Sequence, residues 1–406
     1  MKNIIFVFAI LMAYNASSQI STDTIASEKL KENRVISVSL PPSYKKDKDK
    51  KFPILVLLDG DYLFDPVNGA LKYGYFWDDL PEIIVIAIHQ NKNNEREMDC
   101  EVNQANGTPE EKGIQFFDFI GLELLPILEK KYRIAPFKII AGHDLTAGFM
   151  NLFLFKSEPL FNAYLSFSPE LTTNMENLVP ERLAAIKKPF FYYHSIADGD
   201  IAASQKQARA FDANIKKTEN KNLYYKFDEF KSASHYSMVL FSIPSALYHL
   251  FGVFQPISSQ EYTEKIEPLK SNFIAYLEKK YDIIEKTYNM KIKVRINDMR
   301  AIETAILKNK AYADLDKLAA IARKNYPKSM LADYYLAEMY ENLGDFKKAT
   351  KSYLEAYQRE EIGDLTKDLM VEKSELLKKS IKKAKDVPAT ATEDQGVPAE
   401  TPKKEK

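Results

Sequence analysis

The residues of this chain that could do chemistry centre on segment 140–148, which reads Ile-Ala-Gly-His-Asp-Leu-Thr-Ala-Gly. Its spacing is that of the pattern G-x-S-x-G, which places a nucleophilic serine on a sharp turn from strand to helix, beside two backbone N–H groups. Gly142 stands at the first glycine position, but Asp144 occupies the nucleophile position and Thr146 replaces the last glycine. The segment therefore predicts the turn without predicting the usual serine chemistry.

A serine and an aspartate at this position would do different chemistry. Serine attacks a carbonyl after a histidine has taken its proton, and water later cleaves the ester that forms. An aspartate attacking the same ester would form an anhydride while expelling a poorer leaving group than itself, so the intermediate should collapse backwards. Ordinary ester hydrolysis through Asp144 is therefore not expected.

Aspartate does serve as a nucleophile at sp³ carbon in epoxide hydrolases and haloalkane dehalogenases, to which the Gly-His-Asp triplet is similar. Those enzymes hold the halide or the epoxide oxygen with a cap domain, and the segment between Pro169 and Pro189 is too short for one. Trp77 is the only tryptophan, which further weakens a dehalogenase interpretation. An Asp-nucleophile hydrolase remains the less favoured alternative.

The flanking residues predict the elements that would hold this turn. Before it, Phe137–Ala141 is a short apolar run typical of a strand, and after it Phe149–Phe155 suits a buried helix face. Seven further segments match the motifs of one protein family in the same order along the chain. They are Arg34–Tyr44, Phe52–Tyr62, Arg96 with Asp99, Glu123–Arg133, Phe161–Pro169, His235–Val239 and Ala246–Phe251.

Through these segments, residues 27–254 resemble the putative esterase family of α/β-hydrolases, which includes esterase D, enterobactin-esterase-like enzymes and acetyl- and feruloyl-esterases. The resemblance implies an α/β fold, a three-layer sandwich with a mostly parallel central sheet. It implies an esterase-like domain over residues 19–255.

The resemblance also implies roles for individual residues. His235 takes the place of the catalytic histidine. The acid is expected from the loop after the predicted strand Pro189–His194, where Asp198 and Asp200 both qualify and Asp198 is slightly favoured. The backbone N–H groups of Tyr62 and Leu145 would form the oxyanion hole.

With Asp144 in the nucleophile position, a built-in anion would stand where the transition-state oxyanion belongs. The favoured interpretation is thus an esterase-like pseudoenzyme that keeps the pocket to bind a small-molecule or carbohydrate ester. The alternative is an active hydrolase of carboxylic or carbohydrate esters. Ser166 and Ser168 could replace the missing nucleophile, but the resemblance assigns them to a structural Ser-Pro turn.

The amino terminus has the pattern of an export signal. Lys2 precedes the apolar run Ile4–Ala13 and small residues around Ala16, so residues 1–18 are predicted to be a signal peptide. A run of about ten apolar residues is too short to span a bilayer of roughly 30 Å. A periplasmic or secreted protein, without an integral membrane segment after cleavage, is therefore expected.

Composition and motifs argue against several other classes. The 57 basic and 57 acidic residues cancel, so no global electrostatic attraction favours nucleic acid. Cys100 is the only cysteine and cannot form an internal disulfide. The remaining histidines share no zinc-ligand spacing, and no Gly-rich phosphate loop is present. We predict no metal and no other cofactor.

From residue 256 the pattern changes to long helices, which predicts an all-α domain over residues 256–385. Residues 330–363 resemble a tetratricopeptide repeat, and a weaker copy covers 296–329; the first carries Leu336, Ala337, Tyr340, Gly344, Ala349, Tyr353 and Ala356 at the repeat's spacing. About three repeats make a stable array, so packing or dimerisation is favoured over binding of a protein partner. The tail 386–406 is predicted to be disordered.

Overall fold

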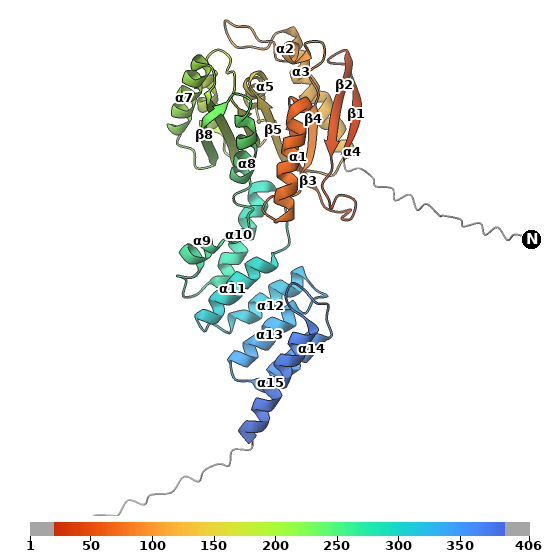
Figure 1. The fold of residues 1–406 in the computed structure, drawn as a ribbon, viewed down its shortest axis with the longest axis vertical. Coiled ribbons are helices and arrows are strands. Elements are labelled where there is room, and N and C mark those ends of the chain that lie inside the picture. The colour runs from red at the N-terminus through yellow and green to blue at the C-terminus, as the bar shows by residue number, and fades with distance from the viewer. Residues whose placement is uncertain (1–19, 386–406) are drawn as a thin grey trace, which may run out of the picture. The chain divides into compact units, whose positions relative to one another are not determined.

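The computed structural model describes residues 20–385, which divide into two compact units (Figure 1). The first unit comprises residues 20–256 together with Lys280–Ile292. The second comprises residues Ile257–Lys279 and 293–385. The predicted signal peptide and the predicted disordered tail lie outside the described residues.

The first unit is built on an eight-stranded sheet with the strand order β1-β2-β4-β3-β5-β6-β7-β8. The six strands from β4 to β8 in this order are parallel, whereas β2 pairs antiparallel with both β1 and β4. This confirms the predicted α/β class. The strands are β1 (Ile20–Ser27), β2 (Glu32–Ser39), β3 (Phe52–Leu57), β4 (Ile84–Ile88), β5 (Ile134–His143), β6 (Ala163–Phe167), β7 (Phe190–Gly199) and β8 (Leu223–Ser234).

Continuous apolar runs form the centre of this sheet because parallel strands are covered on both faces. Every residue of β3 and β4 is buried. Successive side chains of a strand point to opposite faces, so Ile54 and Val56 enter one hydrophobic cluster while Leu55 and Leu57 enter the other.

Helices cover both faces and complete three layers (Figure 1). Side chains of α1 and α8 pack in one cluster, and those of α3 to α7 pack in the other. The helices are α1 (Gly60–Phe76), α2 (Glu95–Asp99), α3 (Glu111–Asp118), α4 (Leu125–Lys131), α5 (Leu145–Phe149), α6 (Met175–Ala185), α7 (Ala202–Lys216) and α8 (Met238–Leu250). A π-helical turn, Phe119–Leu124, joins α3 to α4, and a 3₁₀ turn, Met150–Phe155, follows α5.

The second unit is helical, as expected. It contains α9 (Ser259–Glu261), a π-helical turn (Tyr262–Ile266), the start of α10 (Phe273–Tyr288), and then α11 (Ile296–Lys308), α12 (Asp314–Asn325), α13 (Leu331–Asn342), α14 (Phe346–Tyr357) and α15 (Lys367–Lys385). The pairs α11–α12 and α13–α14 fall within the two predicted repeat ranges. That they are tetratricopeptide repeats stays a prediction.

The end of α10 belongs to the first unit, although the sequence places every residue from 256 onward in the helical domain. Tyr288 is fully buried, and its ring packs against those of Phe137, Phe191 and Phe251. The burial of the Tyr288 ring in this core places the end of α10 in the first unit. A helical pattern in the sequence cannot reveal which core a helix packs against. Among residues 20–385, no helix is long and apolar enough to cross a membrane.

Candidate functional site

The segment around Asp144 forms the predicted strand, turn and helix. β5 ends at His143, Asp144 alone makes the turn, and α5 begins at Leu145. The Asp144 backbone has φ 58° and ψ −118°, a conformation that residues with a side chain rarely adopt and that marks strain at functional turns. Such a turn lifts its side chain above the end of the sheet.

Two glycines make room for this turn. A Cβ atom on Gly142 would come within 2.7 Å of Thr146 Oγ1, and one on Gly148 would lie 1.8 Å from the Glu170 carbonyl oxygen. The Asp144 carbonyl accepts hydrogen bonds from the Gly148 and Glu170 amides at 3.1 and 3.0 Å. The backbone around Asp144 is therefore fixed from several sides.

His235, just after β8, lies against the turn and is paired with Asp200. His235 Nδ1 and Asp200 Oδ1 are 2.7 Å apart, and Asp200 Oδ2 accepts the Ala197 amide at 2.7 Å. The hydrogen bond with Asp200 raises the pKa of His235, and the charge of Asp144 adds to it. Burial alone would raise the pKa of Asp200, but the bonds from His235 and Ala197 bring it below its ordinary value.

Asp200, and not the favoured Asp198, is the carboxylate at His235. Strand β7 continues through Asp198 to Gly199, so Asp198 is still part of the strand and its carboxylate accepts the Ser232 amide of β8 at 2.8 Å. Asp200 is the first residue beyond the strand, and its side chain is buried. The preference for Asp198 was wrong because the predicted strand ended too early.

The Asp144 carboxylate stands between the side chains of His235 and Arg96. Its Oδ1 lies 3.9 Å from His235 Nε2, and its Oδ2 lies 3.5 Å from Arg96 Nη2. Arg96 is itself fixed, since its Nε donates to Asp59 Oδ1 at 2.6 Å and its Nη2 donates to the His143 carbonyl at 2.9 Å. The sequence identified Arg96 only as part of an R-x-x-D segment and gave it no role here.

Asp59, the N-cap residue of α1, is fully buried and explains why a threonine stands at position 146 in place of the usual glycine. Thr146 Oγ1 donates to Asp59 Oδ2 at 2.5 Å and accepts the His143 amide at 3.0 Å. The hydroxyl thus bonds to the carboxylate that also holds Arg96. A buried carboxylate needs several such partners.

The predicted oxyanion donors differ in their surroundings. The Tyr62 amide donates to the Asp59 carbonyl at 3.2 Å as part of the first turn of α1, so this donor is already used. Leu145 is the first residue of α5, and the amides of a helix's first turn have no partner within the helix. The geometry therefore argues against Tyr62, while the role of Leu145 stays a prediction.

A second histidine, His143, and the ring of Tyr236 pack against His235. The ring of His143 lies 4.5 Å from that of His235, and its Nδ1 is 3.0 Å from the Tyr62 hydroxyl. Burial lowers the pKa of His143 to about 4, so this ring is neutral at pH 7. The ring of Tyr236 lies 5.1 Å from that of His235.

The two serines considered as substitutes for the nucleophile lie elsewhere. Ser168 Oγ is 3.3 Å from His235 Nδ1, the ring nitrogen that faces Asp200. Ser166 is fully buried within β6. Neither hydroxyl is placed at Nε2, the nitrogen that faces the turn, so neither can be activated as the serine of a triad would be.

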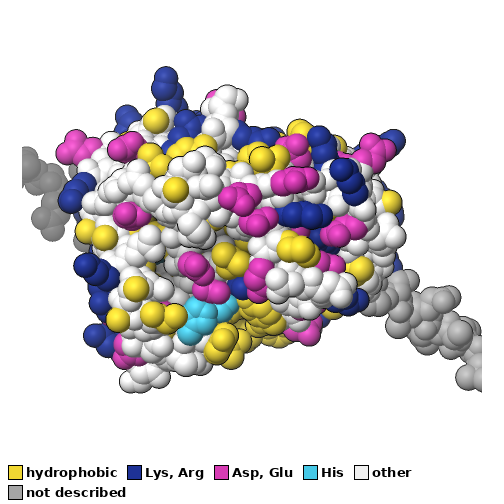
Figure 2. All heavy atoms as spheres, turned by 90° about the horizontal axis from the view of Figure 1, so that it is seen from above, with side chains coloured by type: hydrophobic (Ala, Val, Ile, Leu, Met, Phe, Trp, Pro, Cys, Tyr) yellow, Lys and Arg dark blue, Asp and Glu magenta, His cyan; other side chains and the backbone are white. Residues whose placement is uncertain are grey.

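A cavity of about 730 Å³ adjoins the turn at Leu145. Amides and carboxylates dominate its lining, which includes Glu97, Glu101, Asn103, Gln104, Glu110, Glu170 and Gln207. Seen from above, the first unit carries acidic side chains next to a histidine (Figure 2). Within residues 20–385, no cluster of three or more His, Cys, Asp or Glu side chains could hold a metal ion.

The parallel sheet, the strained turn after β5 and the histidine after β8 define an α/β-hydrolase. Residues 27–235 match the family model described as "Putative esterase", so the chain belongs to this family.

Two solved structures extend this comparison. An uncharacterised protein from Capnocytophaga ochracea is similar at 29% identity and a TM-score of 0.78, over 89% of this chain and 100% of that one. An IroE-like serine hydrolase from Shewanella oneidensis is similar at 19% identity and a TM-score of 0.57, over 75% and 99%. The second likeness shows the fold alone. No curated protein matches the chain.

Proposed function

We propose that this chain is an esterase-type protein in which Asp144 has disarmed the catalytic site and left a ligand-binding site. The single observation that carries the proposal is the carboxylate at the strained turn, between Arg96 at 3.5 Å and His235 at 3.9 Å. A serine hydroxyl in this place would need His235 to take its proton. A carboxylate has no such proton to give and forms an unstable anhydride with an ester.

The electrostatics of His235 support this proposal. Its bond with Asp200 and the nearby Asp144 charge both favour the imidazolium form. The imidazolium form has no free nitrogen that can accept a proton, so a raised pKa narrows the pH range in which His235 could act as a general base. Asp144 therefore removes the nucleophile and also contributes to this narrowing.

The ligand that we propose is a small ester or a carbohydrate ester. The cavity beside Leu145 offers side-chain amides and carboxylates, and such groups pair with hydroxyl groups of a polar ligand. One similar structure is named a serine hydrolase, which fits an ester-binding ancestry.

Hydrolysis of short-chain aryl esters tests the proposal. We expect wild type and His235→Ala to match the buffer rate, while Asp144→Ser gains turnover that is lost again in Asp144→Ser/His235→Ala. Wild-type turnover that disappears in His235→Ala would show a working hydrolase and contradict the proposal. If Asp144→Ser folds but stays inactive, the site has lost more than its nucleophile.

We also propose that the chain is exported, on the pattern of residues 1–18. Cell fractionation of the full-length protein tests this. Recovery in the periplasm or medium, shortened at its amino terminus, is the expected result, and an unprocessed protein in the cytoplasm would contradict it.

For the helical unit we propose tetratricopeptide-type pairing, since α13 and α14 carry small residues such as Ala337 and Ala349 buried at the repeat's spacing. Packing or dimerisation remains the favoured role over a protein partner. Light scattering of the purified chain tests dimerisation, for which a mass of twice the monomer is expected.

A further inference from the structure

One face of α1 carries a line of apolar side chains that starts at the candidate site. Tyr62, Pro66, Ala70 and Tyr73 follow one another at spacings of four, four and three residues, which places them on one side of a helix. Tyr62 is 42% exposed and Tyr73 is 64% exposed. The exposed tyrosines thus belong to one continuous apolar stripe along α1.

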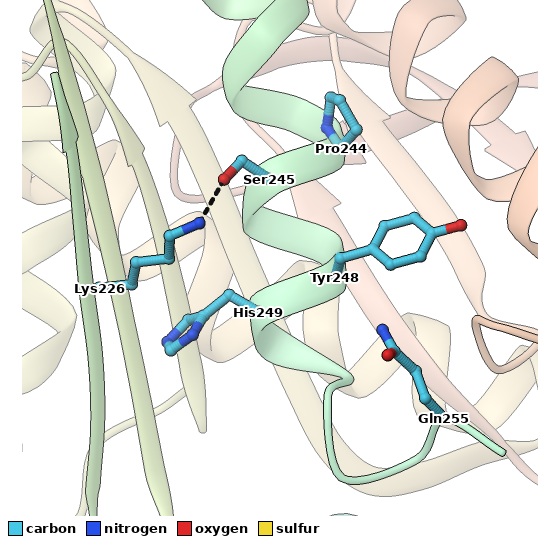
Figure 3. A pocket seen from close by; sticks show the side chains of 6 residues that line it. All are labelled: Lys226, Pro244, Ser245, Tyr248, His249 and Gln255. Atoms are coloured by element: carbon cyan, nitrogen blue, oxygen red, sulfur yellow. Dashed lines mark hydrogen bonds between the residues drawn. The ribbon is translucent and has the colours of Figure 1, made fainter. Parts of the chain in front are cut away.

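A second line of apolar side chains begins just before α8 and runs along it. Tyr236, Leu240, Pro244 and Tyr248 recur every four residues, and Tyr236 and Leu240 are 78% and 62% exposed. Pro244 and Tyr248 project from one side of α8, while Ser245 and His249 project from the other, toward Lys226 on β8 (Figure 3). The helix thus separates its polar contacts from its apolar stripe.

The two stripes enclose a groove. A cavity of about 410 Å³ is lined by Pro66, Ala70 and Tyr73 from α1, and by the α8 stripe from Leu240 onward together with Ile243. None of these lining side chains is charged. Tyr248 of α8 carries a hydroxyl, and this hydroxyl donates a hydrogen bond to Asp79 at 3.1 Å.

Both stripes begin at the histidines of the site. The Tyr62 hydroxyl is 3.0 Å from His143 Nδ1, and the Tyr236 ring lies 5.1 Å from the His235 ring. On the face seen from above, hydrophobic side chains gather beside a histidine (Figure 2). The apolar surface is therefore continuous with the place where we propose that an ester group binds.

From this continuity we propose that the α1–α8 groove holds the acyl chain of the ester whose polar group lies at Asp144 and His235. The inference rests on the proposed function. From Tyr62 to Tyr73 the stripe runs roughly 16 Å at the helical rise of 1.5 Å per residue. A hydrocarbon chain suits such a lining, because a peptide would leave its N–H and C=O groups without partners there. Contiguous exposed apolar surface commonly marks a binding groove.

Binding of two neutral esters to the full chain tests the inference. Calorimetry would compare 1-monolauroylglycerol, below its micelle concentration, with 1-monobutyroylglycerol. Because each fully buried methylene contributes about fourfold in affinity, we expect the longer ester to bind wild type at least tenfold more tightly. In Ala70→Trp, whose indole would fill the groove, the ratio of the two affinities should fall to about one.

Lys72→Trp is the matched control, since Lys72 is exposed on another side of α1 and the ratio should keep its wild-type value. If Ala70→Trp does not fold, Leu240→Ser removes an exposed wall of the groove and should lower the ratio. Equal affinity of the two esters for wild type would overturn the groove inference and leave the proposed function standing. Binding of neither ester would overturn the inference and would also contradict a small acyl ester as the ligand of the site.

A wild-type dimer that Ala70→Trp dissociates, without any dependence on chain length, would mean that a second copy covers the groove, and would also overturn the inference.

Discussion

Buried carboxylates occur in both units, but they are satisfied in different ways. In the hydrolase unit, Asp59 bonds to Arg96 at 2.6 Å and Asp200 to His235 at 2.7 Å. In the helical unit, Glu303 of α11 and Glu338 of α13 are both buried, and Glu338 is close enough to raise the pKa of Glu303.

The difference lies in what balances the charge. At the candidate site a basic side chain, Arg96 or His235, stands beside each carboxylate. In the helical unit Arg300 lies 3.1 Å from Glu303, but burial and the nearby Glu338 raise the pKa of Glu303 to about 8. The site thus gives each of these carboxylates a basic partner, whereas the raised pKa of Glu303 lets the buried helix pair keep a proton to a higher pH than a free carboxyl group does.

Removing the cation from the site should have the largest effect. Arg96→Met would leave Asp59 buried and unpaired, which we expect to lower the free energy of unfolding by about 3–5 kcal/mol. Urea unfolding followed by fluorescence reports on this unit, because Trp77, the only tryptophan, is the C-cap residue of α1. The control is Lys188→Met, since the Lys188–Glu158 pair is exposed and should be worth about 0–1 kcal/mol. Equal losses in the two variants would contradict the comparison.

The helical unit should lose stability as the pH rises. Between the ordinary carboxyl pKa of 4.5 and the raised value of about 8, the folded state binds a proton that the unfolded state has released. The free energy of unfolding should therefore fall from pH 5 to pH 8, by on the order of 2–4 kcal/mol. Hydrogen exchange of α11 and α13, corrected for intrinsic rates, measures it.

Glu338→Gln should flatten this dependence, because a neutral amide leaves Glu303 without a like charge beside it. Glu375→Gln, at an exposed position of α15, should keep the wild-type slope. A helical unit whose stability is constant or rises over this range would show that Glu303 does not keep a proton in the folded state.

A smaller and more specific effect concerns His235. Since its bond with Asp200 is the main cause of its raised pKa and the Asp144 charge is a lesser one, Asp200→Asn should lower the pKa more than Asp144→Ser. Asp198→Asn should leave it unchanged. NMR titration of the histidine resonances would measure these shifts, and a drop with Asp198→Asn alone would restore the original assignment of the acid.

The smallest effect is expected at a neutral neighbour of the same network. Tyr62→Phe removes the hydroxyl bonded to His143, whose ring is uncharged at pH 7. We expect a loss of about 0.5–1.5 kcal/mol in the same urea experiment, as is usual for one neutral hydrogen bond. A loss as large as that of Arg96→Met would mean that charge is not what distinguishes this site.

Local patterns in the sequence were sufficient to predict the turn at Asp144 and the helices of the second unit. The apolar run before Gly142, the glycine itself and the helix after Asp144 all act within a few residues, so the turn could be predicted at its true position. The predicted repeat ranges likewise contain α11 to α14, because helical periodicity is a property of each segment alone.

Contacts between distant segments could not be predicted in this way. The exact end of β7, at Gly199, decided between Asp198 and Asp200. The boundaries of elements are the least certain part of any prediction from sequence patterns. The partnership of Glu303 with Glu338 depends on how two helices pack. Nothing near either glutamate in the chain signals it.

The sequence by itself therefore determined the class of fold, the strained turn and the presence of aspartate where a serine is usual, since each is written in neighbouring residues. Only the tertiary structure decided that Arg96 and His235 flank that aspartate, that Asp200 supports the histidine, and that α1 and α8 align their apolar stripes. The physical reason is that charge pairing and groove formation depend on distances across the fold, which hydrophobic packing sets and short-range spacing does not encode.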